Sequence, residues 1–194
     1  MNAAADNRIY LASRSPRRRE LLGQIGVPHQ LIEADVDESP LPGEAPRDYV
    51  LRLARDKALA GWRALDGRQP APVLAADTTV ALGGRMYGKP LDRADAGRML
   101  AELSGSRHQV FTAIALRLDA RVETALSVSE VEFCVLGADA IREYIASGEA
   151  DDKAGAYGIQ GLAAKFVVEI RGSYSGIMGL PLYETAQLLQ RLHG

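Results

Sequence analysis

Four arginines and two serines are crowded into one short stretch, Leu11–Arg19, which reads LASRSPRRR. The apolar run Ile9–Leu11 predicts a strand just before it. Pro16 is typical of the first position of a helix, and Gly26 is typical of its end. Free amides, hydroxyls and guanidinium groups at the start of one helix favour a bound polyphosphate. The alternative is a capped surface helix with a solvated basic face.

Only some of these side chains can face one ligand. Successive residues of a helix point about 100° apart, so at most two of the three consecutive arginines can share a ligand. Arg17 and Arg18 lie in the first predicted turn and are better placed than Arg19. Ser15 suits the N-cap, where its hydroxyl would accept a hydrogen bond from a first-turn amide. Ser13 offers a second hydroxyl. We expect Ser13, Ser15, Arg17 and Arg18 to bind the ligand.

A carboxylate lies inside the most strand-like run of the chain, Val73–Leu82, which reads VLAADTTVAL. The run is apolar on both faces apart from Asp77 and the two threonines after it, as in a central strand. An ionised carboxylate among apolar neighbours is costly unless it is paired or binds a metal ion. Such groups are found mainly where they function. The alternative is a strand-end carboxylate that accepts hydrogen bonds from neighbouring amides.

Three more charged residues could complete a site. Lys57 lies in a predicted helix from Pro46 to about Leu65, beside its apolar stripe. Lys89 precedes a proline, which favours an extended backbone and fixes its position. Glu38, in the acidic segment DVDES, could supply a metal ligand together with Asp77. The alternative for all three is a solvated surface charge.

As a set, these residues have a chemical logic. Arginines and helix-end amides would hold phosphates, lysines would neutralise more phosphate charge, and a buried carboxylate would bind Mg²⁺ or take a proton from water. These are the groups needed to hydrolyse a phosphoanhydride. The histidines show no metal-ligand spacing, and we assign no role to His29, His108 or His193.

Length and composition limit the possibilities. The 194 residues predict a single domain spanning 1–194, and the net charge of -2 argues against a broad nucleic-acid footprint. One cysteine, Cys134, cannot form an internal disulfide, and its strand-like surroundings predict a buried thiol. No apolar run is long enough for a membrane span, and the start, MNAAADN, lacks the features of a signal peptide. We therefore expect a cytoplasmic protein without membrane contact. The first seven residues are expected to form a frayed end.

The remaining pattern predicts alternating strands and helices. Residues 28–34 predict a second strand, and the runs 108–118 and 122–136 predict an antiparallel pair joined by a tight turn. Helices are expected at 92–104, 139–147 and 181–192, with another strand at 165–170. The glycine-rich segments 151–161 and 172–179 are expected to be loops, and the first of these is polar enough to be functional.

The chain resembles the Maf family of nucleoside triphosphate pyrophosphatases over nearly its whole length. Each matching motif is weak alone, but their order is specific. They are LASRSPRR at 11–18, LARDKA at 53–58, AADTTV at 75–80, GKP at 88–90, LSGSRHQVFTA at 103–113, DKAGAYGIQG at 152–161 and GLP at 179–181. The form of DKAGAYGIQG is similar to the branch that acts on dTTP and UTP, and not to the branch that acts on 7-methyl-GTP.

The resemblance implies a fold and a set of roles. The fold would be mixed α/β, with an elongated, curved sheet flanked by helices and a central cleft between two lobes, as in Maf and inosine triphosphatase proteins. Asp77 would be the proton acceptor and Lys57 its catalytic partner, while Arg17, Thr78 and Gln160 would set base preference. Arg14 stands where many relatives carry a small residue.

The implied activity is hydrolysis of dTTP and UTP to the monophosphate and pyrophosphate with a divalent cation, Mg²⁺, Mn²⁺ or Co²⁺. Modified pyrimidine nucleotides are a second possible substrate class. The partner would be the nucleotide, with no nucleic acid, and the chain could form a homodimer. Because the family's name comes from an effect on septum formation, a regulatory nucleotide-binding protein affecting cell division is the alternative.

Overall fold

The structure, a computed structural model, describes residues 8–192. The predicted frayed start and His193 lie outside the described residues. The elements in chain order are β1 (Ile9–Ala12), α1 (Pro16–Gln24), β2 (His29–Leu31), α2 (Pro46–Arg63), β3 (Val73–Leu82), β4 (Arg85–Tyr87), α3 (Arg93–Leu103), β5 (Arg107–Leu118), β6 (Arg121–Phe133), α4 (Ala138–Ala146), the 3₁₀ turns η1 (Ala154–Ala156) and η2 (Leu162–Phe166), β7 (Val167–Arg171), α5 (Tyr174–Ile177) and α6 (Leu182–Leu192).

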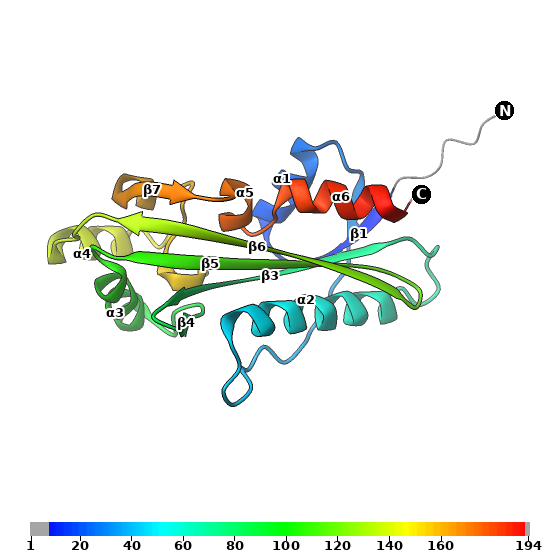
Figure 1. Cartoon of the computed structure of the whole chain (residues 1–194), viewed down its shortest axis with the longest axis horizontal. Helices are drawn as coiled ribbons and strands as arrows, with labels where there is room; N and C mark the ends of the chain where they lie inside the picture. Colours follow the sequence, from blue (N-terminus) through cyan, green and yellow to red (C-terminus); the bar gives the residue numbers. More distant parts are fainter. Residues whose placement is uncertain (1–7, 193–194) are drawn as a thin grey trace.

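One seven-stranded mixed sheet runs through the elongated molecule (Figure 1). Its order is β2-β1-β3-β5-β6-β7, and β4 pairs with the far end of β3. The pairs β1–β2 and β1–β3 are parallel, whereas β3–β5, β5–β6 and β6–β7 are antiparallel. The mixed α/β class and the antiparallel β5–β6 pair are therefore confirmed.

Successive side chains of the central strands point to opposite faces of the sheet, so they pack into two separate hydrophobic cores. Val73 and Ala75 of β3 pack with α2, whereas Leu74 and Ala76 pack with α1 and α6 on the other face. A third core lies at the other end of the sheet, with α3, α4 and the 3₁₀ turns. The same alternation directs Asp77 towards the α2 face and Thr78 towards the α1 face.

Helix α2 lies close against the sheet. Gly61 is buried there, and a Cβ at this position would lie 2.9 Å from Cβ of Ala12 and 2.9 Å from Cγ1 of Val73. Only glycine fits without a shift of these neighbours. The close approach brings Lys57, one turn earlier on α2, to β3.

Several local expectations were wrong. Cys134 is exposed and lies just outside β6, which ends at Phe133. Lys165 and Phe166 belong to η2, so β7 begins only at Val167. The two predicted loops contain short helical turns, η1 and α5. The first loop is also well packed, with the run 155–159 buried.

Candidate active site

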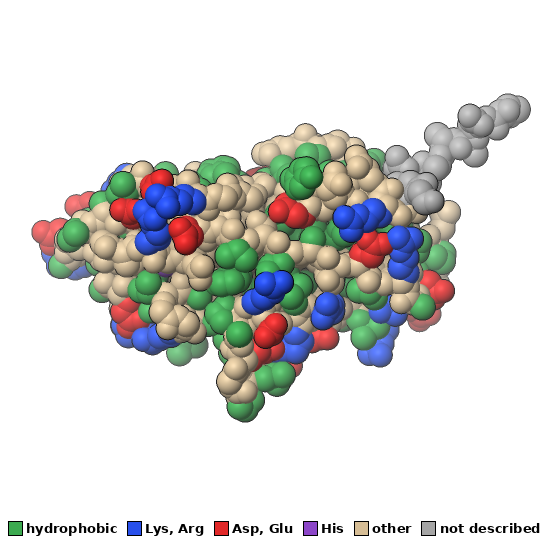
Figure 2. Space-filling view, viewed as in Figure 1, with side chains coloured by type: hydrophobic (Ala, Val, Ile, Leu, Met, Phe, Trp, Pro, Cys, Tyr) green, Lys and Arg blue, Asp and Glu red, His purple; other side chains and the backbone are tan. Residues whose placement is uncertain are grey.

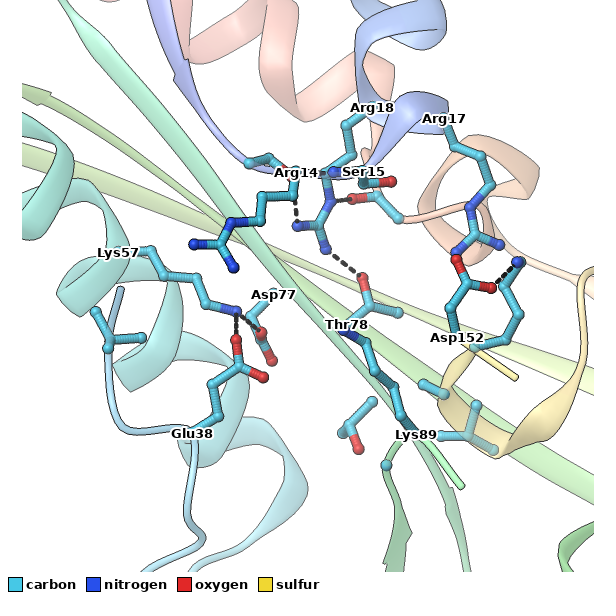
Figure 3. Close-up of a pocket in the computed structure, with 18 of the residues that line it drawn as sticks. Arg14, Ser15, Arg17, Arg18, Glu38, Lys57, Asp77, Thr78, Lys89 and Asp152 are labelled. Atoms are coloured by element: carbon cyan, nitrogen blue, oxygen red, sulfur yellow. Dashed lines mark hydrogen bonds and ion pairs between the residues drawn. The ribbon is translucent and has the colours of Figure 1, made fainter. Parts of the chain in front are cut away.

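A gap along one edge of β3 creates the site. On this edge β1 pairs with residues 73–75 and β4 with residues 80–82. Among the described residues, 76–79 have no strand partner on this side, whereas β5 covers the opposite edge. A cavity of about 800 Å³ opens beside the gap, a volume typical of small-molecule sites. Figure 3 shows its charged side chains converging from α1, α2, β3 and the loops.

Asp77 is a buried carboxylate at the centre of the charged groups. Its side chain is only 8% exposed, and its Oδ1 accepts a hydrogen bond of 2.7 Å from Nζ of Lys57. The same Nζ lies 2.6 Å from Oε1 of Glu38, whose side chain is 52% exposed. Lys57 therefore bridges a buried and a half-exposed carboxylate (Figure 3). The interpretation of Lys57 as a solvated helix lysine is excluded.

Burial and charge act against each other at this cluster. Burial raises the pKa of Asp77, and the charges of Lys57 and Arg18 only partly offset this effect. Burial also acts to raise the pKa of Glu38, but the hydrogen bond and charge of Lys57, together with the charges of Lys89 and Arg18, lower that pKa overall. Asp77 is consequently the better proton acceptor of the two carboxylates, because a raised pKa makes a stronger base.

Arg18 connects three distant segments instead of projecting freely. Its Nε donates to the carbonyl of Gly179 at 2.8 Å, and its Nη1 donates to the carbonyl of Ala76 at 2.8 Å and to Oγ of Ser13 at 3.2 Å. Its Nη2 donates to Oγ1 of Thr78 at 3.2 Å. Ala76 lies in the gap of β3, so Arg18 satisfies a carbonyl that lacks a strand partner.

The remaining predicted phosphate ligands are placed differently. Ser15 occupies the N-cap of α1, but its side chain makes no capping bond; its amide donates instead to Oγ of Ser13 at 3.2 Å. Arg17 and Lys89 line the cavity, and their side chains make no hydrogen bond or ion pair with another described residue. Burial lowers the pKa of Arg17, and the nearby charge of Asp152 opposes this effect. Arg17 and Lys89 are thus the cations most available to a ligand.

A second part of the cavity lining, called the apolar end below, belongs to the third core. It includes Val80, Val110, Tyr157, Ile159 and Ile177. Gln160 is exposed and does not line the cavity, although the preceding residue, Ile159, does. The base-reading roles expected for Arg17, Thr78 and Gln160 stay predictions, and that of Gln160 requires a local movement of the turn.

Three residues at or next to the cavity were not predicted from the sequence: Arg14, Tyr157 and His108. Arg14 lines the cavity mouth and its Nη2 lies 2.7 Å from Oδ1 of Asp35. Tyr157 also lines the cavity, and its hydroxyl lies 2.9 Å from Nε2 of buried His108. Burial lowers the pKa of His108 to about 4, so this histidine is neutral at physiological pH. Spacing could not reveal the His108–Tyr157 pair, because 49 residues separate its members.

The sequence profile of the Maf-like protein family matches residues 8–192. The chain belongs to the Maf family. Two Maf relatives, each named dTTP/UTP pyrophosphatase, match nearly end to end. The protein of Aromatoleum aromaticum is 57% identical over 194 residues, covering 94% of each chain. The protein of Nitrosomonas europaea is 52% identical over 200 residues, covering 98% of this chain and 97% of the relative.

A solved structure supports the fold of this Maf chain. The Ham1 protein of Staphylococcus aureus superposes with a TM-score of 0.53 and 16% sequence identity, covering 96% of this chain and 100% of the other. At this identity the likeness concerns the arrangement of elements alone. The mixed sheet with flanking helices is thus shared between the two proteins.

Proposed function

We propose that this protein hydrolyses dTTP and UTP to the corresponding monophosphate and pyrophosphate. The observation that carries the proposal is Asp77, a buried carboxylate with a raised pKa at a cavity lined by cations. The relatives named dTTP/UTP pyrophosphatase, 57% and 52% identical over nearly the whole chain, support the choice of nucleotides.

The cavity's two ends orient a nucleotide. The triphosphate lies at the charged end, where Arg17 and Lys89 bind phosphate oxygens and Lys57 neutralises charge beside Asp77. The base lies at the apolar end. A water molecule beside Asp77 loses its proton to the carboxylate and attacks the α-phosphorus in line with the bond to pyrophosphate. The basic side chains stabilise the charge that grows on the leaving pyrophosphate.

Asp77 and Glu38 fit a divalent cation. They already hold a cation between them, the ammonium of Lys57, and Mg²⁺ typically binds one or two carboxylates together with substrate phosphates. Within residues 8–192, no group of three or more His, Cys, Asp and Glu side chains is arranged to hold a metal alone. A bound Mg²⁺, Mn²⁺ or Co²⁺ would neutralise phosphate charge.

The decisive experiment is a turnover screen. Pyrophosphate release is measured from all canonical and several modified triphosphates with Mg²⁺, Mn²⁺ or Co²⁺ and with EDTA, using Asp77→Asn as the control. We expect dTTP and UTP to be the best substrates, CTP and purine nucleotides to be poorer, and EDTA to abolish turnover. Nucleotide binding without pyrophosphate release from any substrate would contradict the proposal and favour a regulatory nucleotide-binding protein.

We propose that the protein acts in the cytoplasm, that its binding partner is the nucleotide and that it forms a homodimer. No helix within residues 8–192 has the length and apolar character needed to cross a bilayer. Basic and acidic side chains are interspersed on the face shown in Figure 2, which suits a small ligand better than a nucleic acid. Sedimentation of the purified chain over a range of concentrations tests the homodimer, and fractionation of cells tests the location.

A further inference from the structure

The segment from Glu149 to Leu162 supplies part of the apolar end of the cavity, next to the charged lining residues Asp152 and Lys153, and it needs an anchor. Its residues Tyr157 and Ile159 line the cavity and are both buried. If the proposed function holds, these two side chains contact the nucleoside. Ala156, the last residue of η1 and directly before Tyr157, has a φ of 59°, which is unfavourable for a residue with a side chain. Surrounding contacts must therefore hold this backbone in place.

The carboxylate of Glu149 closes the segment on itself. Its Oε2 accepts a hydrogen bond of 2.9 Å from the amide of Leu162, and its Oε1 accepts one of 2.9 Å from the hydroxyl of Tyr144. That hydroxyl in turn accepts a hydrogen bond of 3.0 Å from the amide of Gly158. Glu149 and Tyr144 together hold the segment on both sides of Ile159 and Gln160.

The surrounding backbone is shaped around this carboxylate. A Cβ at Gly161 would lie 2.2 Å from Oε2 of Glu149, and a Cβ at Gly158 would lie 3.2 Å from its Oε1. Tyr144 is only 1% exposed, and burial raises its pKa, so it remains a protonated donor. The two glycines thus allow the carboxylate to approach the backbone closely, which a side chain at Gly161 would prevent.

We propose that Glu149 is a positioning residue that fixes the nucleoside-binding wall through Leu162 and Tyr144. It does not line the cavity, so it acts on substrate only through the segment that it holds. The phosphate ligands Arg17 and Lys89 come from other elements, and Glu149 acts on Arg17 only through its charge, which favours the protonated guanidinium. Loss of the anchor is therefore expected to weaken recognition of the nucleoside while leaving recognition of the triphosphate intact.

The test compares Glu149→Ala and Glu149→Gln with Glu143→Ala, which removes an exposed glutamate of α4. Steady-state kinetics with UTP, CTP and GTP are combined with calorimetric binding of UTP and of inorganic tripolyphosphate in EDTA. For Glu149→Ala we expect KM for UTP to rise roughly tenfold, kcat to change less than about threefold, and preference for UTP to fall. Tripolyphosphate binding should weaken less than about twofold, because the substitution removes a negative charge near Arg17 and leaves the phosphate ligands in place.

Glu149→Gln separates position from charge. Its carbonyl can accept from Leu162 and its amide can donate to the Tyr144 hydroxyl, so we expect it to retain most of the UTP affinity. If Glu149→Gln instead loses as much as Glu149→Ala, or if both variants keep wild-type KM and base ranking, Glu149 does not position the wall. Equal weakening of UTP and tripolyphosphate binding also overturns the proposal.

Two further measurements keep the outcome interpretable. If Glu149→Ala does not fold, Tyr144→Phe removes the hydroxyl that links Glu149 to Gly158, and a smaller loss of UTP preference is expected. An unchanged preference in Tyr144→Phe would contradict the proposal. If the wild type hydrolyses no triphosphate, the proposed function fails, but the comparison of UTP and tripolyphosphate binding in EDTA still tests Glu149.

Discussion

The two ends of the cavity are built in different ways. At the charged end, side chains bind directly to the central strand: Lys57 to the carboxylate of Asp77, and Arg18 to the carbonyl of Ala76. At the apolar end, a glycine-rich segment is folded back on itself and held by Glu149 and Tyr144. The comparison indicates that the proposed catalytic groups are fixed by the sheet, whereas the proposed base recognition depends on a separately anchored segment.

The largest expected effect is at the charged end. Asp77→Asn keeps the size of the side chain but removes the proton acceptor, so kcat should fall about 10²–10⁴-fold while the protein remains folded. Pyrophosphate release and circular dichroism measure the two properties. If the variant keeps more than about a tenth of wild-type turnover, Asp77 is not the base and the charged end loses its assigned role.

Arg18→Ala tests whether the charged end is anchored as described. The change leaves the carbonyls of Ala76 and Gly179 without their donor, and should cost about 3 kcal/mol in the free energy of unfolding. For a chain of this size, Tm should fall by roughly 6–12 °C. Arg18→Lys should not restore it, because one ammonium cannot reproduce the planar guanidinium. Arg19→Ala is the control, and an equal loss in that variant would argue against the anchor.

At the apolar end, the prediction concerns Gln160. A glutamine amide offers one donor and one acceptor and can pair with both O4 and N3–H of uracil, provided the turn brings it to the cavity. Gln160→Ala should reduce the preference for UTP over GTP roughly tenfold. Gln160→Glu should impair UTP more, because a carboxylate meets the O4 acceptor without a donor. An identical ranking of UTP, CTP and GTP in all three proteins would show that Gln160 does not read the base.

The smallest expected effect is a shift of a pH profile, which is read separately from the fall in kcat expected when Glu38, a proposed ligand of the divalent cation, is replaced. Burial raises the pKa of Asp77, and the negative charge of Glu38 contributes a smaller increase. Glu38→Gln removes that charge and should lower the pKa of Asp77, so the acid limb of kcat/KM should move to lower pH. A limb that stays in place or moves to higher pH would show that it reports another group.

The sequence predicted the charged end better than the apolar end, and the reason is physical. Arg17, Lys57 and Asp77 belong to short motifs whose chemistry is visible locally, and helix and strand periodicity places them correctly. The cation bridge from Lys57 to Asp77 and Glu38 depends on α2 lying against the sheet, which local pattern cannot show. The sequence indicated which residues matter there but not which pairs form.

Elsewhere the decisive contacts are long-range. Arg18 was expected to bind phosphate, yet its bonds to Ala76 and Gly179 span 58 and 161 residues of sequence. Cys134 looked like part of a strand, but the strand ends just before it. Glu149 gave no local signal, since its partners are a tyrosine on the preceding helix and an amide beyond the glycines.

The β5–β6 hairpin has a consequence for how the molecule folds. Its strands pair from Arg107 with Glu132 to Leu118 with Arg121 and need only a two-residue turn, so closing them costs little chain entropy. Pairing of β1 with β3, by contrast, joins Leu11 to Leu74. We expect the hairpin to form early and the β1–β3 edge late, so the gap that holds Asp77 takes shape near the end of folding. Amide hydrogens of β5 and β6 should then gain protection before those of β1.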